Sequence, residues 1–386
     1  MKIVHMCLGE HYVDGYGYQE NCLTKMHKQL GHEVFVLAST ETYIKQKRTY
    51  LKPSEYSNEY GIPVTRIPYV SWLPHKIAIK LRYYQGIYNY LKSKEPDIIF
   101  IHSGCFLGMK EVVKYVKTHP VRVYVDSHTD YVNSGKNWLS MNVLHKVLYR
   151  HAHQSILPYT KKFYGTLPIR NVYLNEIYKI PKGKIEYLPM GIDLSDIKMS
   201  ERESLRAQMR KKYGIKDTDF VVVTGGKLEK RKNTIELINA FSIFPNSDVK
   251  LFLFGSVSDN IKEEFDRCLN SLKDRVTYAG WAKWDEIYKY VFVGDLAVFP
   301  GTHSAIWEQT VGLGIPCIFK YMENITQIDL GGNCDFLNDS SAEEISSKIA
   351  YYYIHRDALN KMKDNAEDKG PKYFSYLEIA RRAIEC

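Results

Sequence analysis

The feature that most constrains the fold of this chain is a repeated alternation of short apolar runs with helical segments. In the first half the runs are KIVHMC, EVFVLA, DIIFIH, VRVYVD, SILPY and KIEYLP, and a second series starts at Phe220. Apolar runs of this length, separated by helical stretches, are typical of parallel strands joined by crossover helices. The sequence therefore predicts an α/β protein with two Rossmann-like, doubly wound parallel sheets.

Composition agrees with a folded two-domain protein. The chain has 386 residues, of which 45% are hydrophobic and 25% charged, and this balance is typical of globular domains with their own cores. No apolar run approaches the roughly 20 residues that span a bilayer, and the N-terminus enters a strand without a signal-peptide core. The seven cysteines are scattered without C-x-x-C spacing. We expect a cytoplasmic protein with reduced thiols and no metal site.

The stretch FVVVTGGKLEKRKN, residues 220–233, joins a predicted strand to a predicted helix. Its β-branched run ends in Gly225-Gly226, and the cations Lys227, Lys230, Arg231 and Lys232 follow at once. A strand, a glycine turn and a cluster of cations together suit a bound diphosphate. The alternative is an exposed basic turn with no ligand.

A second stretch, HSAIWEQTVGLGIP at 303–316, has the same position in its βα unit. Glu308 lies in the first turn of a predicted helix that closes on Gly-x-Pro and returns to the strand CIF. A carboxylate at this place can accept hydrogen bonds from a ribose diol. The alternative is a helix-start glutamate that is favoured by the helix dipole alone.

These residues carry a resemblance to the retaining glycosyltransferases of family 4, which have the GT-B fold. The C-terminal domain of that family begins with a pattern close to G-R/K-L-x-x-x-K-G, and Gly226, Lys227, Leu228 and Lys232 match it. Asn233 stands where the family has the final glycine.

The second family motif is matched only in part. It has two glutamates with seven residues between them, followed by G-x-P, and Glu308 with Gly314-Ile315-Pro316 resembles its second half. Pro300 stands at the place of the first glutamate, and the loop that follows, 301–305, is shorter than the family's E-G-F-G loop.

Smaller similarities follow in family order along nearly the whole chain, among them the opening 1–39, PDIIFIHSG, VRVYVDSHTD, YLPMGIDLSDI, KLFLFGS, RVTYAGW and DLAVFPG. The resemblance implies an N-terminal acceptor-binding domain at 1–196 and a C-terminal donor-binding domain at 197–371, facing across a cleft. It also implies a C-terminal helix, 372–386, that packs back on the first domain.

The resemblance also implies roles for individual residues. The expected catalytic residues are Lys227, Lys232 and His128. The expected donor contacts are Gly15, Gly17, Gly226, Gly255, Trp281, His303, Ser304, Ala305 and Glu308, and the acceptor-side candidates are Tyr16, His102 and Asp130. Glycines permit close backbone approach to the diphosphate. A helix N-cap is the alternative role of Ser304.

The implied activity is transfer of a sugar, with retention, from a nucleotide-diphosphate sugar to a hydroxyl of a glycan or lipid-linked glycan in bacterial surface polysaccharide or glycolipid biosynthesis. UDP-sugars are favoured, and we expect no metal and no cofactor besides this co-substrate. The alternatives are a catalytically silent GT-B partner subunit, motivated by the missing first glutamate, and a GT-B nucleotide-sugar 2-epimerase. A nicotinamide enzyme is disfavoured because no G-x-G-x-x-G opens the first helix.

The net charge of +9 calls for an explanation. Residues 72–94 combine basic and aromatic side chains, and a helix with such faces is typical of an interfacial contact, here at the inner membrane surface. The alternative is a helix that packs its apolar side on the sheet and exposes its lysines. No nucleic-acid-binding motif is present, so we expect no nucleic acid partner.

Overall fold

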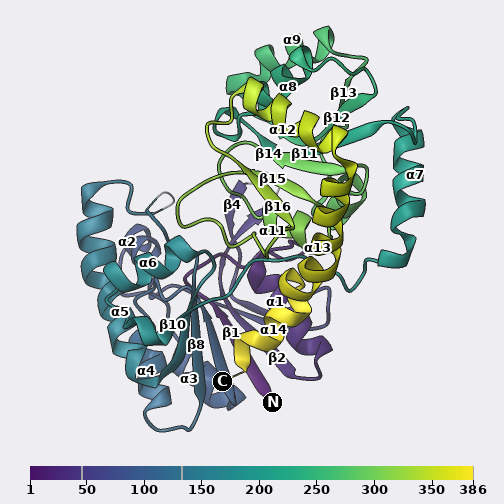
Figure 1. The fold of residues 1–386 in the computed structure, drawn as a ribbon. Coiled ribbons are helices and arrows are strands. Elements are labelled where there is room, and N and C mark those ends of the chain that lie inside the picture. The colour runs from purple at the N-terminus through teal and green to yellow at the C-terminus, as the bar shows by residue number, and fades with distance from the viewer. Residues whose placement is uncertain (45–46, 132–133, 386) are drawn as a thin grey trace. The chain divides into compact units, whose positions relative to one another are not determined.

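The structure is a computed structural model that describes residues 1–44, 47–131 and 134–385. The chain divides into two compact units. Unit 1 comprises residues 1–189 and 379–386, and unit 2 comprises residues 190–378. The division thus falls before residue 190, whereas the sequence placed it after residue 196, and residue 386 of the predicted last helix lies outside the described residues. Each unit contains a predominantly parallel sheet, as the sequence predicts (Figure 1).

Unit 1 is built on an eight-stranded sheet in the order β10-β9-β8-β7-β1-β2-β6-β5. All neighbours are parallel except β5 and β6. The strands are β1 (Lys2–Cys7), β2 (Glu33–Ser39), β5 (Ser54–Ser57), β6 (Pro63–Ile67), β7 (Ile98–His102), β8 (Arg122–Ser127), β9 (Thr160–Gly165) and β10 (Ile185–Tyr187). β3 (Glu41–Ile44) and β4 (Lys47–Tyr50) form a separate antiparallel pair. β7 is buried along its whole length, as expected for a central strand covered on both faces.

In unit 1, one segment that the sequence predicts as a strand is helical instead. The helical elements of this unit are α1 (Gln19–Gln29), α2 (His75–Leu81), α3 (Ile87–Lys94), α4 (Met109–Val116), a π-helix (Ser140–Tyr149), α5 (Arg150–Ile156), a 3-10 turn (Leu157–Tyr159), α6 (Pro168–Glu176) and a 3-10 turn (Lys182–Lys184). The prediction of a strand at SILPY is wrong, because this segment forms the end of α5 and the turn that follows. Pro158 has no N–H to donate to a sheet but suits the first turn of a helix, and the strand β9 begins just after it.

Residues 72–94 do not form the single helix that the sequence predicts. They form α2 and α3, separated by Arg82 at φ 48° and Gly86 at φ 89°, both in the left-handed region that a helix cannot continue through. Tyr83, Tyr84, Ile87 and Tyr90 are buried in the core of unit 1. The aromatic face of this segment is therefore core packing, whereas Trp72, Lys76, Ile77 and Lys80 are exposed.

Unit 2 is built on a six-stranded, fully parallel sheet in the order β13-β12-β11-β14-β15-β16. The strands are β11 (Phe220–Leu228), β12 (Val249–Val257), β13 (Val276–Tyr278), β14 (Leu296–Phe299), β15 (Cys317–Lys320) and β16 (Cys334–Leu337). The α-helices are α7 (Arg202–Lys212), α8 (Thr234–Ile243), α9 (Lys262–Ser271), α10 (Ile287–Val291), α11 (Ile306–Gly312), α12 (Ala342–Ile354), α13 (Arg356–Phe374) and α14 (Tyr376–Ile384), and 3-10 turns lie at Met199–Glu201, Lys230–Lys232, Asp259–Ile261 and Trp284–Glu286.

The last helix, α14, belongs to unit 2 at its start and to unit 1 from Ile379 onward. Its residues Ile379, Ala380 and Ala383 are fully buried. The hydroxyl of Tyr124 on β8 donates to the carbonyl of Ile384 over 3.3 Å. The end of the chain is therefore an integral part of the unit 1 core, and it continues from α13 as the yellow helix of Figure 1.

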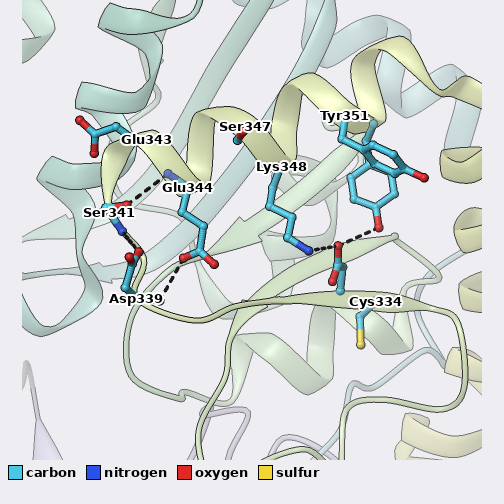
Figure 2. Close-up of a pocket in the computed structure, with 10 residues that line it drawn as sticks. Cys334, Asp339, Ser341, Glu343, Glu344, Ser347, Lys348 and Tyr351 are labelled. Atoms are coloured by element: carbon cyan, nitrogen blue, oxygen red, sulfur yellow. Dashed lines mark hydrogen bonds and ion pairs between the residues drawn. The ribbon is translucent and has the colours of Figure 1, made fainter.

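A pocket of unit 2 lies at the β16 edge of its sheet, against α12 (Figure 2). It has a volume of about 910 Å³ and a polar wall. The carboxylate of Asp335 accepts from the Lys348 amine over 2.6 Å and from the Tyr352 hydroxyl over 3.0 Å, while Glu344 accepts three backbone N–H groups at 338–340. These polar groups stabilise the turn into α12 and the end of β16, and none of the predicted site residues lies among them.

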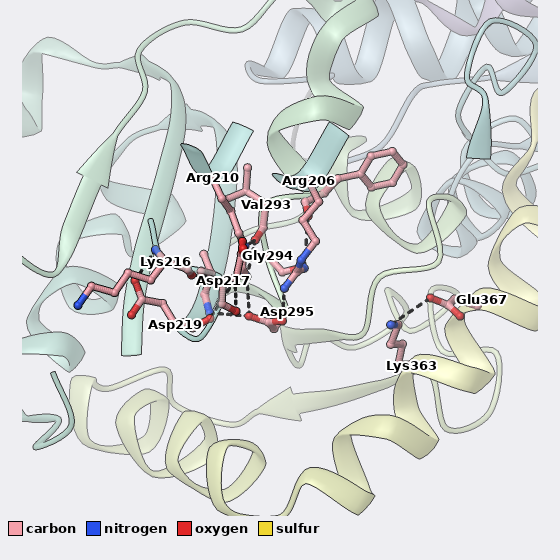
Figure 3. Close-up of polar contacts among 12 residues, drawn as sticks. Arg206, Arg210, Lys216, Asp217, Asp219, Val293, Gly294, Asp295, Lys363 and Glu367 are labelled. Atoms are coloured by element: carbon pink, nitrogen blue, oxygen red, sulfur yellow. Dashed lines mark hydrogen bonds and ion pairs between the residues drawn. The ribbon is translucent and has the colours of Figure 1, made fainter. Parts of the chain in front are cut away.

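A buried arginine network ties α7 to the sheet of unit 2 (Figure 3). Asp295, just before β14, accepts from Arg206 over 2.5 Å, from Arg210 over 2.8 Å and from the backbone N–H of Val221 over 2.7 Å. Arg210 is 1% exposed and also donates to the carbonyl of Val293 over 2.9 Å. One carboxylate thus fixes the first helix of unit 2 against two adjacent strands.

We predict that Asp295→Ala lowers the free energy of unfolding of unit 2 by about 2–4 kcal/mol, because it leaves Arg210 buried without its carboxylate. The urea midpoint, followed by circular dichroism, measures this loss. The matched control is Lys363→Ala, which removes an ion pair to Glu367 between side chains that are each 42% exposed. Exposed pairs contribute little, so the control should change by less than about 0.5 kcal/mol. Equal losses in both variants would contradict the assignment.

Candidate functional site

The predicted donor residues of unit 2 gather at the carboxyl ends of four neighbouring strands, β13, β12, β11 and β14. Ligands of open parallel sheets bind at this edge. Gly226 of β11 pairs in register with Gly255 of β12, at φ 100° and φ 119° respectively. A Cβ on Gly255 would lie 1.8 Å from the Gly226 carbonyl oxygen, so the two backbones approach as closely as only glycine allows.

Lys232 connects two strand-end loops. It follows β11 in a 3-10 turn, and its amine donates to the carbonyls of Thr302 and His303, the latter over 2.8 Å. A Cβ on Gly301 would lie 2.2 Å from the Lys232 Cα, so the loops are in direct backbone contact. Burial, with a contribution from the neighbouring Arg231, lowers the pKa of Lys232 to about 8. The lysine therefore shapes the loop after β14 as well as supplying charge.

The other cations of this turn are partly neutralised by an acid that the sequence analysis did not weigh. Glu229 pairs with Lys227 over 3.2 Å and with Arg231 over 2.5 Å. The Lys227 and Arg231 side chains are 60% and 61% exposed, so both can leave Glu229 for another anion at small cost. The predicted contact of Lys227 with a diphosphate stays a prediction.

Glu308 lies at the start of α11 with a fully buried carboxylate. The ring nitrogen Nε2 of His303 lies 2.8 and 3.0 Å from its two oxygens, and the Gln327 amide donates to Oε1 over 3.0 Å. The structure thus joins two predicted donor residues, His303 and Glu308. A ribose diol would have to use the remaining lone pairs of the carboxylate or displace one of these partners. Sequence analysis missed Gln327, because it lies in the loop between β15 and β16 without any motif.

The two departures from the family pattern contact each other. Asn233 stands where the family has glycine, and it keeps the left-handed backbone at φ 51°, which asparagine tolerates better than most residues. Its side-chain amide donates to the carbonyl of Pro300, the residue at the place of the missing glutamate, over 2.9 Å. The substitution of the glycine therefore supplies a hydrogen bond that anchors the altered loop.

The remaining donor candidates of unit 2 lie on the same edge. Ala305 is the N-cap of α11 without a side-chain cap bond, so the N-cap alternative for Ser304 is wrong; the Ser304 carbonyl accepts the Trp307 N–H over 2.9 Å. The Gly255 N–H donates to the Gly280 carbonyl and its own carbonyl accepts from Tyr278, each over 2.7 Å. These backbone groups already have partners, whereas the indole of Trp281 is 64% exposed.

In unit 1 the predicted residues gather at the carboxyl ends of β1, β7 and β8, which are also neighbours. Gly15 has φ 74°, and its N–H donates to the Glu59 carboxylate over 3.0 Å. Gly17 lies just before α1, and the ring of Tyr16 lies 5.2 Å from that of Tyr18. These residues form the loop between β1 and α1, and their ligand roles stay predictions.

His128 and His102 meet at one carboxylate. Asp126, at the end of β8, lies 2.7 Å from Nδ1 of His102 and 3.9 Å from Nε2 of His128, and it accepts the backbone N–H of Ser103 over 3.1 Å. The His128 side chain is 22% exposed, but that of His102 has no exposed surface. His102 is therefore not open to a ligand directly, and its predicted acceptor-side role stays a prediction. Asp130 pairs with Arg170 over 3.1 Å.

A pocket of about 610 Å³ lies beside His128 in unit 1. Its wall includes Glu10, Lys80, Arg82, His128, Lys136 and Tyr149. Arg82 donates to the carbonyl of Gly9, and cations outnumber acids on this wall. Sequence analysis missed the pocket because its wall comes from segments far apart in the chain: the β1 loop, α2, the β8 loop and the π-helix.

Residues 206–369 match the family model of the glycosyl transferases group 1. The alpha-monoglucosyldiacylglycerol synthase of Acholeplasma laidlawii is 24% identical over 359 residues, which cover 88% of this chain and 84% of that protein. A glycosyltransferase from Rickettsia africae superposes with a TM-score of 0.71 at 16% identity, covering 99% of this chain and 96% of that one. Anabaena HepE in complex with UDP superposes with a TM-score of 0.68 at 14% identity, covering 99% and 98%.

The fold is that of the GT-B glycosyltransferases. Residues 206–369 of unit 2 match the group 1 glycosyl transferases, and the predicted GT-B fold is confirmed. Assignment to family 4 in particular stays a prediction. Among the described residues, no group of three or more histidine, cysteine, aspartate or glutamate side chains is arranged to hold a metal ion.

We predict that Asn233→Ala destabilises the protein by about 1–2 kcal/mol, because alanine is strained at positive φ and leaves the Pro300 carbonyl without its donor. Asn233→Gly should cost less, since glycine accepts the left-handed backbone freely. Urea unfolding of both variants measures the difference. Equal losses in the two variants would show that the hydrogen bond alone matters, and a larger loss in the glycine variant would contradict the prediction.

Proposed function

We propose that this chain transfers a sugar from a nucleotide-diphosphate sugar to a hydroxyl of a glycerolipid or lipid-linked glycan. The observation that carries the proposal is the contact of Lys232 with the loop that holds His303 and Glu308, inside the segment that matches the group 1 glycosyl transferases. The similarity to a glycolipid synthase over most of both chains supports the lipid acceptor. The complex of HepE with UDP supports a uridine nucleotide as donor.

The chemistry of this edge suits departure of a nucleoside diphosphate. Negative charge grows on the leaving phosphate as the glycosidic bond breaks, and preorganised cations lower the barrier. The Lys232 ammonium has three N–H donors, of which the Thr302 and His303 carbonyls take two. One donor and the full charge remain for a phosphate oxygen. Lys227 and the exposed Arg231 provide further positive charge nearby.

We further propose that the transfer retains the anomeric configuration and needs no metal ion. An inverting enzyme needs a side chain that deprotonates the acceptor from the opposite face. The two glutamates at this edge are poor candidates, because Glu308 is bonded to His303 and Gln327 and Glu229 is paired with two cations. With retention, the leaving phosphate itself can take the proton of the attacking hydroxyl.

The proposed function is tested by a panel of UDP-, GDP- and other nucleotide sugars in thermal shift, since a ligand of the native state raises the melting temperature. We expect a clear shift with a UDP-sugar.

Lys232→Ala and Glu308→Ala should each lower turnover at least about tenfold while remaining folded. Lys262→Ala, an exposed lysine on α9 paired with Asp266, is the control and should not change turnover. No shift with any nucleotide, and no transfer, would instead favour the catalytically silent partner subunit.

The acceptor is proposed to enter the pocket of unit 1 from a membrane surface. Exposed apolar side chains lie close in sequence to residues of this pocket: Trp72 just before α2 and Ile77 on it, the helix that carries Lys80, and Trp138 and Leu139 between the lining residues Asn137 and Ser140. Apolar side chains among cations suit a surface with anionic lipids. Among the described residues, no helix has the length and apolar character needed to cross a bilayer.

We predict that the double variant Trp138→Ser, Leu139→Ser binds vesicles of anionic lipid about tenfold more weakly, because two exposed apolar side chains are removed from the contact. Co-sedimentation with vesicles measures the bound fraction. Ile354→Ser is the control, since Ile354 is equally exposed, at 68%, but lies on α12 of unit 2. If the wild type does not bind vesicles, or if the control loses as much binding, the membrane contact is wrong.

A further inference from the structure

Three buried histidines in unit 1 form an unbroken hydrogen-bonded chain between Asp126 and the carbonyl of Ala380. His102 Nδ1 lies 2.7 Å from the Asp126 carboxylate, and its Nε2 lies 2.9 Å from Nδ1 of His5. The second nitrogen of His5 lies 2.9 Å from Nδ1 of His27, and Nε2 of His27 lies 2.9 Å from the Ala380 oxygen. All three rings are fully buried. The chain runs from the carboxyl edge of β7 and β8, through the centre of β1 and the end of α1, to α14.

The two ends of this chain determine how many protons it holds. A carbonyl oxygen only accepts, so His27 must donate from Nε2, and a neutral imidazole then accepts at its other nitrogen. The same rule makes His5 donate to His27 and accept from His102. His102 has then used its single neutral proton, yet its Nδ1 faces the acceptor-only carboxylate of Asp126. Four hydrogen bonds need four protons, and three neutral rings carry three.

We propose that His5, His27 and His102 form a one-proton relay that holds His102 as an imidazolium against Asp126 and thereby sets the charge felt by His128. The Ala380 carbonyl is the end stop of the relay, because it fixes the direction in which every ring donates. His5 and His27 are positioning residues: they act through His102 and Asp126, and neither has an exposed surface.

The environment of each group agrees with this placement of the proton. Burial, with the neighbouring rings, lowers the pKa of His5, and burial lowers the pKa of His27 to about 4. Burial opposes a charge on His102 as well, but the adjacent Asp126 carboxylate raises its pKa above the ordinary value. The pKa of Asp126 is lowered, since His102 outweighs its burial. The extra proton thus belongs at the carboxylate end.

Few other charged groups face the relay. Glu20 on α1 is buried, which raises its pKa to about 7, and Glu10 lies in the β1 loop; both act on His102. His32 lies 6.1 Å from the ring of His27. Cys7 on β1 is neutral because burial raises its pKa, and Phe100 packs on the ring of His5 at 5.4 Å. Among the described contacts of the Asp126 carboxylate there is no lysine or arginine side chain. No such cation therefore replaces the His102 imidazolium as its counter-charge.

The consequence reaches the edge of unit 1 through Asp126. With the relay protonated, the pair of His102 and Asp126 is neutral overall, and burial keeps the pKa of His128 below its ordinary value. Without the extra proton, the pair carries one negative charge 3.9 Å from Nε2 of His128, which favours the charged form of that ring. The relay therefore keeps His128 neutral, and able to accept a hydrogen bond, near neutral pH.

A matched pair of variants at His27 tests the end stop. In His27→Gln the amide can still donate to Ala380 and accept from His5, so the direction of donation is kept. In His27→Leu the end stop no longer acts on His5. His5 can then donate to His102, which donates to Asp126, and two neutral rings satisfy two hydrogen bonds without an extra proton.

The charge state is measured by ¹⁵N NMR of histidine-labelled protein at pH 7 to 8. We expect one buried imidazolium in the wild type and in His27→Gln, and its loss in His27→Leu. A wild type with only neutral buried rings would overturn the proposal without any variant having to fold. An imidazolium that persists in a folded His27→Leu would overturn the role of the Ala380 end stop.

The effect on His128 is read from the pH dependence of kcat/KM, a step that rests on the proposed glycosyl transfer. In His27→Leu the acidic limb should move up by about one pH unit, so that kcat/KM at its foot falls about tenfold, while His27→Gln keeps the wild-type profile. Uniform loss at all pH values would show a merely structural effect and overturn the coupling. If the chain transfers no sugar, only the proposed function fails, because the NMR result decides the relay independently.

Discussion

The hydrogen bonds from the Lys232 amine to the carbonyls of Thr302 and His303 hold the strand-end edge of unit 2 in one arrangement. They join the loop after β11 to the loop after β14, two strands that are neighbours in the sheet. Gly301 permits the contact, since any side chain there would meet the Lys232 backbone. A charged amine in this position can serve structure and chemistry together, because an ammonium donates three hydrogen bonds and the loop uses two.

The altered loop after β14 is consistent with this constraint. Pro300 and Asn233 both depart from the family pattern, and they are hydrogen-bonded to each other. Glu308, which the pattern retains, is held by His303 from the same loop and by Gln327 from outside it. The loss of one acidic residue is thus accompanied by a rearranged set of hydrogen bonds, which argues against a loop that has merely decayed.

Unit 1 solves a different physical problem, namely polar side chains in the centre of a buried parallel sheet. His5 and His102 lie on strands that are otherwise apolar, and burying an unpaired imidazole would be costly. Hydrogen bonds among His5, His27 and His102, and to Asp126 and the Ala380 carbonyl at the two ends, give every ring nitrogen of these three histidines a partner. The last partner is a carbonyl of α14, so the end of the chain takes part in the charge balance at the strand ends beside His128.

Sequence alone determined the elements that depend on local pattern. Apolar runs that alternate with helical stretches predicted most central strands, and the order of the motifs predicted the GT-B class, because burial on both faces leaves a direct mark on neighbouring residues. Failures arose where neighbours in space are distant in sequence. Residues 72–94 have a helical composition, yet Arg82 and Gly86 break them into two helices that bury their tyrosines. Likewise, the pairing of Glu308 with Gln327, of Asn233 with Pro300 and of His27 with Ala380 joins residues 19, 67 and 353 positions apart. Only the tertiary structure could decide these contacts, because hydrogen-bond partners of buried polar groups are chosen by which segments the packed sheet brings together.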